Sequence, residues 1–82
     1  MGAQLKKANL SYANLSGADL RGANLTAANL SHANLDSAVM TGANLTEANL
    51  TGVNLSQTDI GEVNLTQTNL RGAIMPDGAI HA

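Results

Sequence analysis

The chain has 82 residues, 44% of them hydrophobic, and four basic against six acidic side chains give a formal net charge of −2. It contains no cysteine, which excludes disulfides and thiolate metal sites, and no apolar run of the roughly 18 residues that a membrane-spanning helix needs. The weak negative charge argues against direct nucleic-acid binding, and Tyr12 is the single aromatic side chain available for base stacking. No basic, apolar signal segment is visible at the start, so we expect a cytoplasmic location.

A leucine-like residue recurs at every fifth position from Leu5 to Ile80. Two residues before each stands a small residue, and the residue between the two is Asn in ten of the sixteen repeats. The small residue and the Leu share one face of an extended segment, while the Asn points away. A step of five would scatter the leucines around an α-helix and alternate them across a flat strand. The period therefore predicts a chain that bends after each three-residue segment, so that every Leu turns toward one axis.

The two residues between successive extended segments have the composition of tight turns. Ser or Thr comes first in nine repeats, where its hydroxyl can bond the local backbone. Gly comes second in six repeats, and it supplies the positive φ of a type II turn without steric cost. The sequence predicts type II turns at these glycines. It predicts type I turns where the second residue is larger, as at Tyr12, Ala27, His32, Glu47 and Gln57.

Runs such as ANLSGADLRGANLTAANL (residues 13–30) resemble the pentapeptide-repeat family, whose signature is A-[DN]-L-x-x. The closing GAIMPDGAIH (residues 72–81) is similar to the ends of repeat arrays in cyanobacterial members. The resemblance implies an all-β fold, the right-handed quadrilateral parallel β-helix or repeat-five-residue fold, with four repeats in each of about four coils. We expect a single domain over residues 1–82, with repeats over 3–82 and a turn around 74–82 that blunts the last sheet edge.

With four repeats per coil, residues twenty apart would lie above one another. Two of the inner columns would be Leu5, Leu25, Leu45, Leu65 and Leu20, Met40, Ile60, Ile80. An outer ladder of amides, hydrogen-bonded between layers, would run through Asn9, Asn29, Asn49 and Asn69. Thr58 and Thr68 replace the small inward residue, and we expect each hydroxyl to bond a carbonyl.

Four residues are candidates for a surface interaction. Tyr12 and His32 occupy the same corner in neighbouring coils, where they either stack as a recognition patch or are simply exposed neighbours. Val39 and Ile74 replace an outward Asn, and each is either an apolar surface position or part of a contact surface. Their columns lie on different faces, so we do not expect them to merge into one patch.

No catalytic, cofactor or metal site is predicted, which indicates a protein that is not an enzyme. In the sequence, no second His or carboxylate stands at metal-ligand spacing from His81. Asp19 and Asp59 would lie two coils apart, roughly 10 Å on strand spacing. Asp36 and Ser37 lack the partnering His that nucleophilic catalysis needs.

The two ends of the repeat array differ. Pro76 removes a backbone donor, and the following Asp-Gly turns the chain, which protects the C-terminal edge from further pairing. At the other end the repeats begin at Ala3 without the cap that repeat arrays usually carry. We expect either that this domain is cut from a longer chain or that two molecules meet N-end to N-end as a homodimer.

Two functions are compatible with these patterns. The first is a non-catalytic structural or protein–protein interaction module, a rigid rod that binds an unknown protein partner and neither nucleic acid nor membrane. The second is implied by the resemblance: some pentapeptide-repeat proteins mimic duplex DNA and bind DNA gyrase. Those members are longer, more acidic and rich in Phe, whereas this chain has no Phe.

Overall fold

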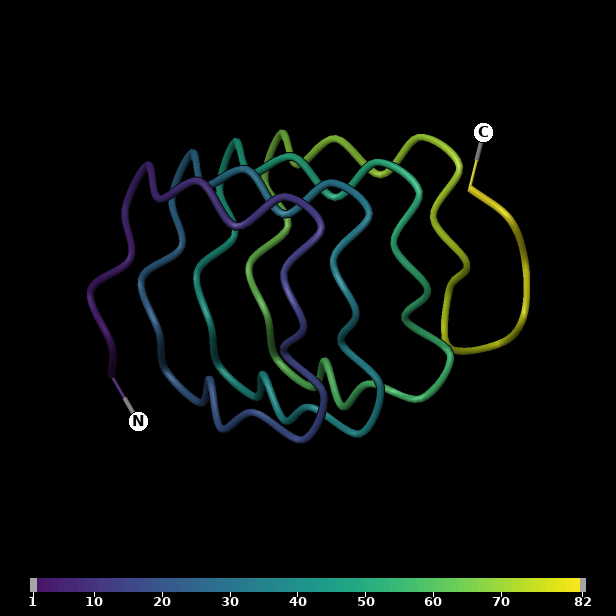
Figure 1. Ribbon diagram of the computed structural model, residues 1–82, viewed down its shortest axis with the longest axis horizontal. Coiled ribbons are helices and arrows are strands. Elements are labelled where there is room, and N and C mark those ends of the chain that lie inside the picture. The colour runs from purple at the N-terminus through teal and green to yellow at the C-terminus, as the bar shows by residue number, and fades with distance from the viewer. Residues whose placement is uncertain (1, 82) are drawn as a thin grey trace.

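The computed structural model describes residues 2–81, which wind into stacked coils along the longest axis, with the two termini at opposite ends (Figure 1). Within residues 2–81 there is no helix and no continuous strand, and the β contacts are isolated bridges. Parallel bridges join residues twenty apart, such as Asn9 with Asn29 and Asn29 with Asn49. Twenty residues contain four repeats, so each repeat lies against the repeat four positions later.

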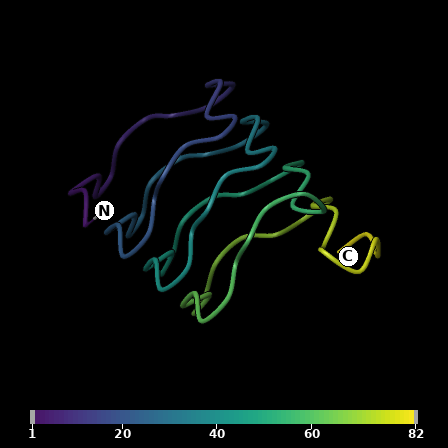
Figure 2. The same ribbon diagram turned by 90° about the horizontal axis from the view of Figure 1, so that it is seen from below.

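Main-chain hydrogen bonds connect each coil to the next. Leu10 N–H donates to the Asn29 carbonyl over 2.7 Å, and Asn29 N–H donates back to the Ala8 carbonyl over 2.9 Å. At the corner, Tyr12 N–H donates to the Ser31 carbonyl over 3.0 Å. The same three bonds recur at most repeats, so the coils stack like the strands of a parallel sheet (Figure 2).

Apart from the last repeat, one place interrupts this register in the described part of the chain. Asn34 and Asn54 form no bridge, although they are twenty residues apart, and Ser37 N–H donates to the Gln57 carbonyl instead of the Ser56 carbonyl. The neighbouring Thr58 hydroxyl points inward and donates to the Leu35 carbonyl over 2.8 Å. The inward bond of Thr58 confirms the expectation for that side chain, and Thr68 does the same with Leu45 over 2.7 Å.

The prediction of type I turns at the larger corner residues is wrong for four of the five positions. Each corner closes with a hydrogen bond such as Ala13 N–H to the Leu10 carbonyl over 3.0 Å. The second corner residue has positive φ, whether it is Gly or one of Tyr12, Ala27, His32 and Glu47, at 58° to 61°. These turns are therefore type II, and only Gln57 lacks the positive φ.

The stack explains this uniform turn type. The N–H of the second corner residue must point at the next coil, as Ala27 N–H does toward the Thr46 carbonyl at 2.8 Å. The left-handed conformation costs an L-residue roughly 1–2 kcal/mol. The inter-coil hydrogen bonds offset this cost, and the residue type does not decide the conformation.

The outward Asn side chains stabilise the turns rather than bridging the coils. Asn29 Oδ1 accepts from the Ser31 N–H two residues on, at 3.0 Å, and Asn49 Oδ1 does the same with Thr51. A side-chain bond between layers occurs where Asn24 Nδ2 donates to Gln4 Oε1 over 3.3 Å. The expected inter-layer bonding along the Asn9 ladder is thus wrong, because the short Asn side chain reaches its own turn first.

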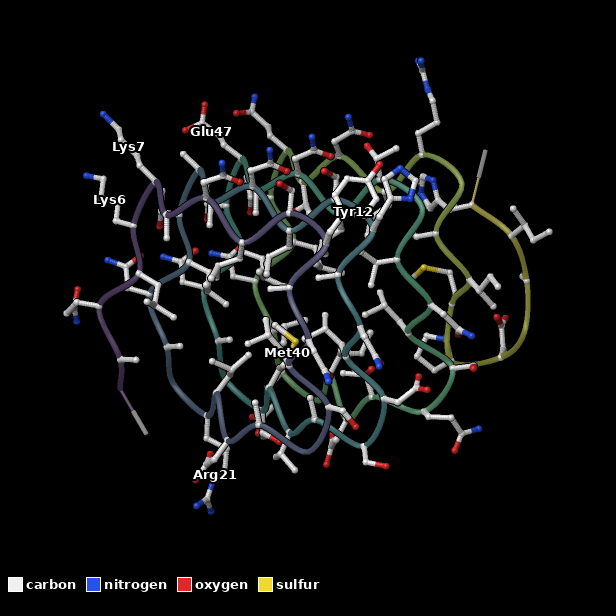
Figure 3. All side chains as sticks on the ribbon, viewed as in Figure 1. Lys6, Lys7, Tyr12, Arg21, Met40 and Glu47 are labelled. Carbon is white, nitrogen blue, oxygen red and sulfur yellow. The ribbon has the colours of Figure 1, made fainter. Side chains whose placement is uncertain are left out.

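The core consists of the inward Leu and Ala positions. In the middle coils these side chains are fully buried, as Leu25, Met40 and Leu50 are, and Met40 lies at the centre of the stack (Figure 3). Toward the ends burial is incomplete, and Leu5, Leu10, Leu15, Ile60 and Leu65 are only partly covered. The inward residues from Leu5 to Met75 therefore lie in the predicted inner columns.

The last repeat departs from its column. Ile80 was expected beneath Ile60 in the core, but it is 73% exposed and pairs antiparallel with Ile74. Met75 N–H donates to the Ala79 carbonyl over 2.8 Å, which folds the chain back as a hairpin. Pro76 cannot donate a ladder hydrogen bond, and Gly78 adopts φ +87°, so the chain reverses instead of starting another side.

Candidate interaction surface

Tyr12 and His32 form an aromatic pair on one corner of the stack. Their ring centroids are 5.2 Å apart and the planes differ by 19°, so the rings are stacked. Tyr12 is 76% exposed and points away from the core (Figure 3). Gly52 continues the corner, and a Cβ there would lie 2.6 Å from His32 Nδ1. The absence of a side chain at Gly52 therefore leaves room for the His32 ring, while the role of the pair in recognition stays a prediction.

Val39 and Ile74 do not join this corner. Both are half-buried, and Val39 bridges Asp19 and Asp59 in the neighbouring coils. Ile74 bridges Asn54 on one side and the hairpin residue Ile80 on the other. Because they belong to different columns, the structure offers no single apolar patch from the two.

An ion pair lies on the same column as Val39. Arg21 Nη2 is 2.7 Å from Asp19 Oδ2, and Arg21 Nε donates to Asp19 Oδ1 over 2.8 Å. These side-chain hydrogen bonds, with the Arg21 backbone N–H, hold the pKa of Asp19 well below its usual value. Both side chains are about half exposed, so the pair is a surface feature and leaves Asp19 no role as an acid or base near neutral pH.

The hairpin creates a feature that the sequence did not reveal. An open hollow of about 580 Å³ lies beside the turn, lined by Met75, Pro76, Asp77, Ala79, Ile80 and His81. The five-residue pattern places Ile80 in the core, so it does not indicate that Asp77, Ile80 and His81 line one hollow. The lining is mostly apolar, and residues 2–81 contain no group of three or more His, Cys, Asp or Glu side chains placed to hold a metal ion.

Two further observations bear on the chemistry of the described residues. No side-chain nitrogen or oxygen that is buried within residues 2–81 lacks a hydrogen-bond partner. None of the structured segments there is a helix long and apolar enough to cross a lipid bilayer.

Several solved structures are similar to this chain. A pentapeptide-repeat protein from Nostoc PCC 7120 matches with a TM-score of 0.88 and 37% identity over 92% of this chain and 62% of its own. A protein of the Arabidopsis thaliana thylakoid lumen matches with a TM-score of 0.80 and 39% identity, over 85% of this chain and 49% of its own. A third, from Cyanothece 51142, is 48% identical with a TM-score of 0.71, over 74% and 42%.

This chain spans about half the length of these proteins, and no curated protein sequence matches it. The relatives imply that the coils form a right-handed β-helix. Residues 3–42 and 38–76 match the sequence model described as Pentapeptide repeats, in eight copies. Together with the 20-residue register of the coils, this match shows that the chain belongs to the pentapeptide-repeat family.

Proposed function

We propose that the chain is a non-catalytic structural or protein–protein interaction module, a rigid quadrilateral rod of about four coils that presents fixed polar faces to another protein. The observation that carries the proposal is the ladder of main-chain hydrogen bonds that joins the coils at most repeats, with Leu and Ala filling the interior. A surface held in this way loses little conformational entropy on binding, which favours recognition. Pentapeptide-repeat proteins are generally non-catalytic, and membership of this family supports the same conclusion.

The corner of Tyr12 and His32 is the part of the surface that we assign to partner contact. Aromatic side chains are enriched in the centres of protein interfaces, where their large rigid area is buried at small entropic cost. Tyr12 is already held by its stack on His32, so its orientation is fixed before a partner arrives. Val39 and Ile74 are the secondary candidates, since each puts an apolar side chain on a face otherwise made of Asn.

Affinity capture from the source organism tests this proposal. The folded chain serves as bait, Leu45→Asp as the unfolded control, and Tyr12→Ala and Glu47→Ala as matched variants at exposed corners with φ near 60°. We expect a partner that is retained by the unaltered chain and by Glu47→Ala but lost with Tyr12→Ala. Equal recovery from folded and unfolded bait would contradict the interaction module, and equal recovery from both corner variants would contradict the assigned corner.

The alternative, a DNA-mimicking binder of DNA gyrase, has less support. Duplex DNA presents a dense and regular negative charge. Here Asp19 is neutralised by Arg21, and the remaining acids Asp36, Glu47, Asp59, Glu62 and Asp77 are scattered over different corners and faces. We therefore expect no inhibition of gyrase supercoiling at micromolar chain concentration, and inhibition there would restore the alternative.

The cytoplasmic location that the sequence suggests stays a prediction. One similar protein comes from the thylakoid lumen, so similarity to known structures does not point to the cytoplasm alone.

A further inference from the structure

The hydrogen-bond ladder between the second and third coils is open on one side of the stack. On this side residues 33–35 lie against residues 53–55. The pattern of the other sides requires Leu35 N–H to donate to the Asn54 carbonyl, and Asn54 N–H to donate to the Ala33 carbonyl. Neither bond is present, and these four main-chain groups form no other hydrogen bond within the described part of the chain. We call the place between the two segments the open junction.

The opening is confined to this one place inside the stack. On the same side, Leu15 N–H donates to the Asn34 carbonyl over 2.8 Å in the junction before it. In the junction after it, Leu55 N–H donates to the Ile74 carbonyl over 2.7 Å. The three other sides of the second and third coils keep their bonds to each other. The open junction is therefore bounded by closed ladders in every direction except the outer face.

The side chains at the open junction are more exposed than their counterparts in the same two coils. Asn34 and Asn54 are exposed, whereas the outward Asn side chains on two other sides are half-buried. The half-buried ones are Asn24, Asn29, Asn44 and Asn49. The inward Leu35 and Leu55 remain fully buried. Solvent therefore reaches the open junction from the outer face, while the core closes its inner side.

The corner at Gln57 explains the opening. Type I and type II turns differ in the orientation of their central peptide, which here joins Ser56 and Gln57. Gln57 lacks the positive φ of the type II corners, and Ser37 N–H donates to the Gln57 carbonyl over 2.8 Å instead of to the Ser56 carbonyl. This shift by one residue acts as a β-bulge, which leaves the neighbouring groups of a ladder unpaired.

We infer that the open junction is a binding site for ordered water. One molecule joins Leu35 N–H to the Asn54 carbonyl, and another joins Asn54 N–H to the Ala33 carbonyl. Main-chain groups in protein interiors are bonded either within the protein or to ordered water, and a bound water needs about two to four polar partners. Each bridge supplies a donor and an acceptor. The amide Nδ2 groups of Asn34 and Asn54 form no hydrogen bond within residues 2–81, and they offer further donors at the outer face.

Direct closure of the junction requires a different corner. Ser37 N–H would have to return to the Ser56 carbonyl, and the turn would then need the left-handed conformation at Gln57, which is unfavourable for an L-residue. The Thr58 hydroxyl also donates to the Leu35 carbonyl over 2.8 Å, which holds the two coils in the shifted arrangement. Water satisfies the open groups without any change at the corner.

NMR spectroscopy of the isotope-labelled chain tests the site. Nuclear Overhauser contacts with water should appear at the amides of Leu35 and Asn54, and not at Leu30, which donates directly to Asn49 over 2.8 Å. Scalar coupling across the hydrogen bond should join Leu30 to Asn49 but not Leu35 to Asn54. Amide exchange at Leu35 should exceed that at Leu30 by roughly fivefold or more, the factor that one hydrogen bond is typically worth.

The Thr58 hydroxyl needs its own control, because a hydroxyl proton exchanges with water and can relay a false contact to Leu35. Val occupies the same inward position at Val53 and Val63, so Thr58→Val should fold. The water contacts should persist in this variant. Their loss would overturn the inference.

Two glycine variants form a matched pair. Glycine takes positive φ without steric cost, so Gln57→Gly should convert the corner to type II, pair Leu35 directly with Asn54 and remove the water contacts. Gln67 already has φ 56°, so Gln67→Gly should leave Leu35 unchanged. Scalar coupling between Leu35 and Asn54 in the unaltered chain, or no water contact at either amide, would overturn the inference. Equal water contacts in both glycine variants would contradict the assignment of the site to the Gln57 corner.

Discussion

Individual residues in the corners hold conformations that their chemistry does not prefer. Ala27 has φ 59° and Glu47 φ 60°, values at which most proteins place glycine. Neither forms a special side-chain contact that would require this conformation. The ladder of hydrogen bonds between coils imposes it, so the corner residues store strain that substitution can release.

Replacing Ala27 by Gly should therefore stabilise the chain. The left-handed penalty of about 1 kcal/mol disappears, and part of the gain is offset because Gly makes the unfolded chain more flexible. Gly42→Ala is the reverse substitution and serves as the control. A Cβ at Gly42 meets nothing within 4 Å, so this variant adds only the cost of the left-handed conformation. Thermal unfolding should give a higher midpoint for Ala27→Gly and a lower one for Gly42→Ala, and midpoints that move in the same direction would contradict the account.

Inward and outward positions should respond to a carboxylate in opposite ways. Leu45 is 1% exposed, and a charge buried there without a partner costs several kcal/mol, enough to remove most of the stability of a small domain. Asn44 points outward, and a carboxylate keeps the acceptor for Thr46 N–H, as Asp59 does for Gly61 N–H. Leu45→Asp should abolish cooperative urea unfolding, while Asn44→Asp should shift its midpoint little; equal effects would refute the inward assignment.

The corner column of Tyr12, His32 and Gly52 behaves as one element. A Cβ on Gly52 would come within 2.5 Å of the His32 ring, so Gly52→Ala should displace the ring and break its stack on Tyr12. Because the chain has no Trp or Phe, the near-ultraviolet circular dichroism signal reports Tyr12 alone. That signal should change in Gly52→Ala and not in Gly42→Ala, although in both variants an alanine must adopt the unfavourable left-handed conformation. An unchanged signal in both would show that the ring is not held by this column.

These elements also show which structural features can be predicted from the sequence alone. The five-residue period predicted the inner columns and the placement of His32 next to Tyr12, because both depend only on which residues recur at the same register. It left open whether the two rings stack, which the structure shows they do. It failed at the corner of Ala27, where bonds between coils outweigh local preference. It also failed at Ile80, where a regular repeat pattern continues although Pro76 and Gly78 reverse the chain. These outcomes depend on contacts with other coils and ends, which a local pattern does not contain.

At the scale of the whole molecule, stability should vary along the axis. Each coil contacts only its neighbours, so opening can begin at an end and proceed inward. Leu10 N–H and Leu30 N–H make equivalent bonds, to Asn29 and Asn49, but within residues 2–81 only Leu30 has a coil on either side. Hydrogen exchange of this 82-residue chain should therefore be faster at Leu10 than at Leu30. Equal protection at the two amides would indicate a single cooperative unit instead of stepwise opening from the ends.

The 20-residue register has a consequence for how such a chain changes length. Insertion or deletion of twenty residues between Tyr12 and the C-terminal hairpin returns every later residue to its own side of the rod. A change of five residues leaves the A-N-L-x-x pattern intact but turns everything after it by one side, so that Tyr12 would lie over Ser37 instead of His32 after loss of one intervening repeat. Small duplications in the gene can therefore rearrange the entire surface while every residue of the core keeps an equivalent environment.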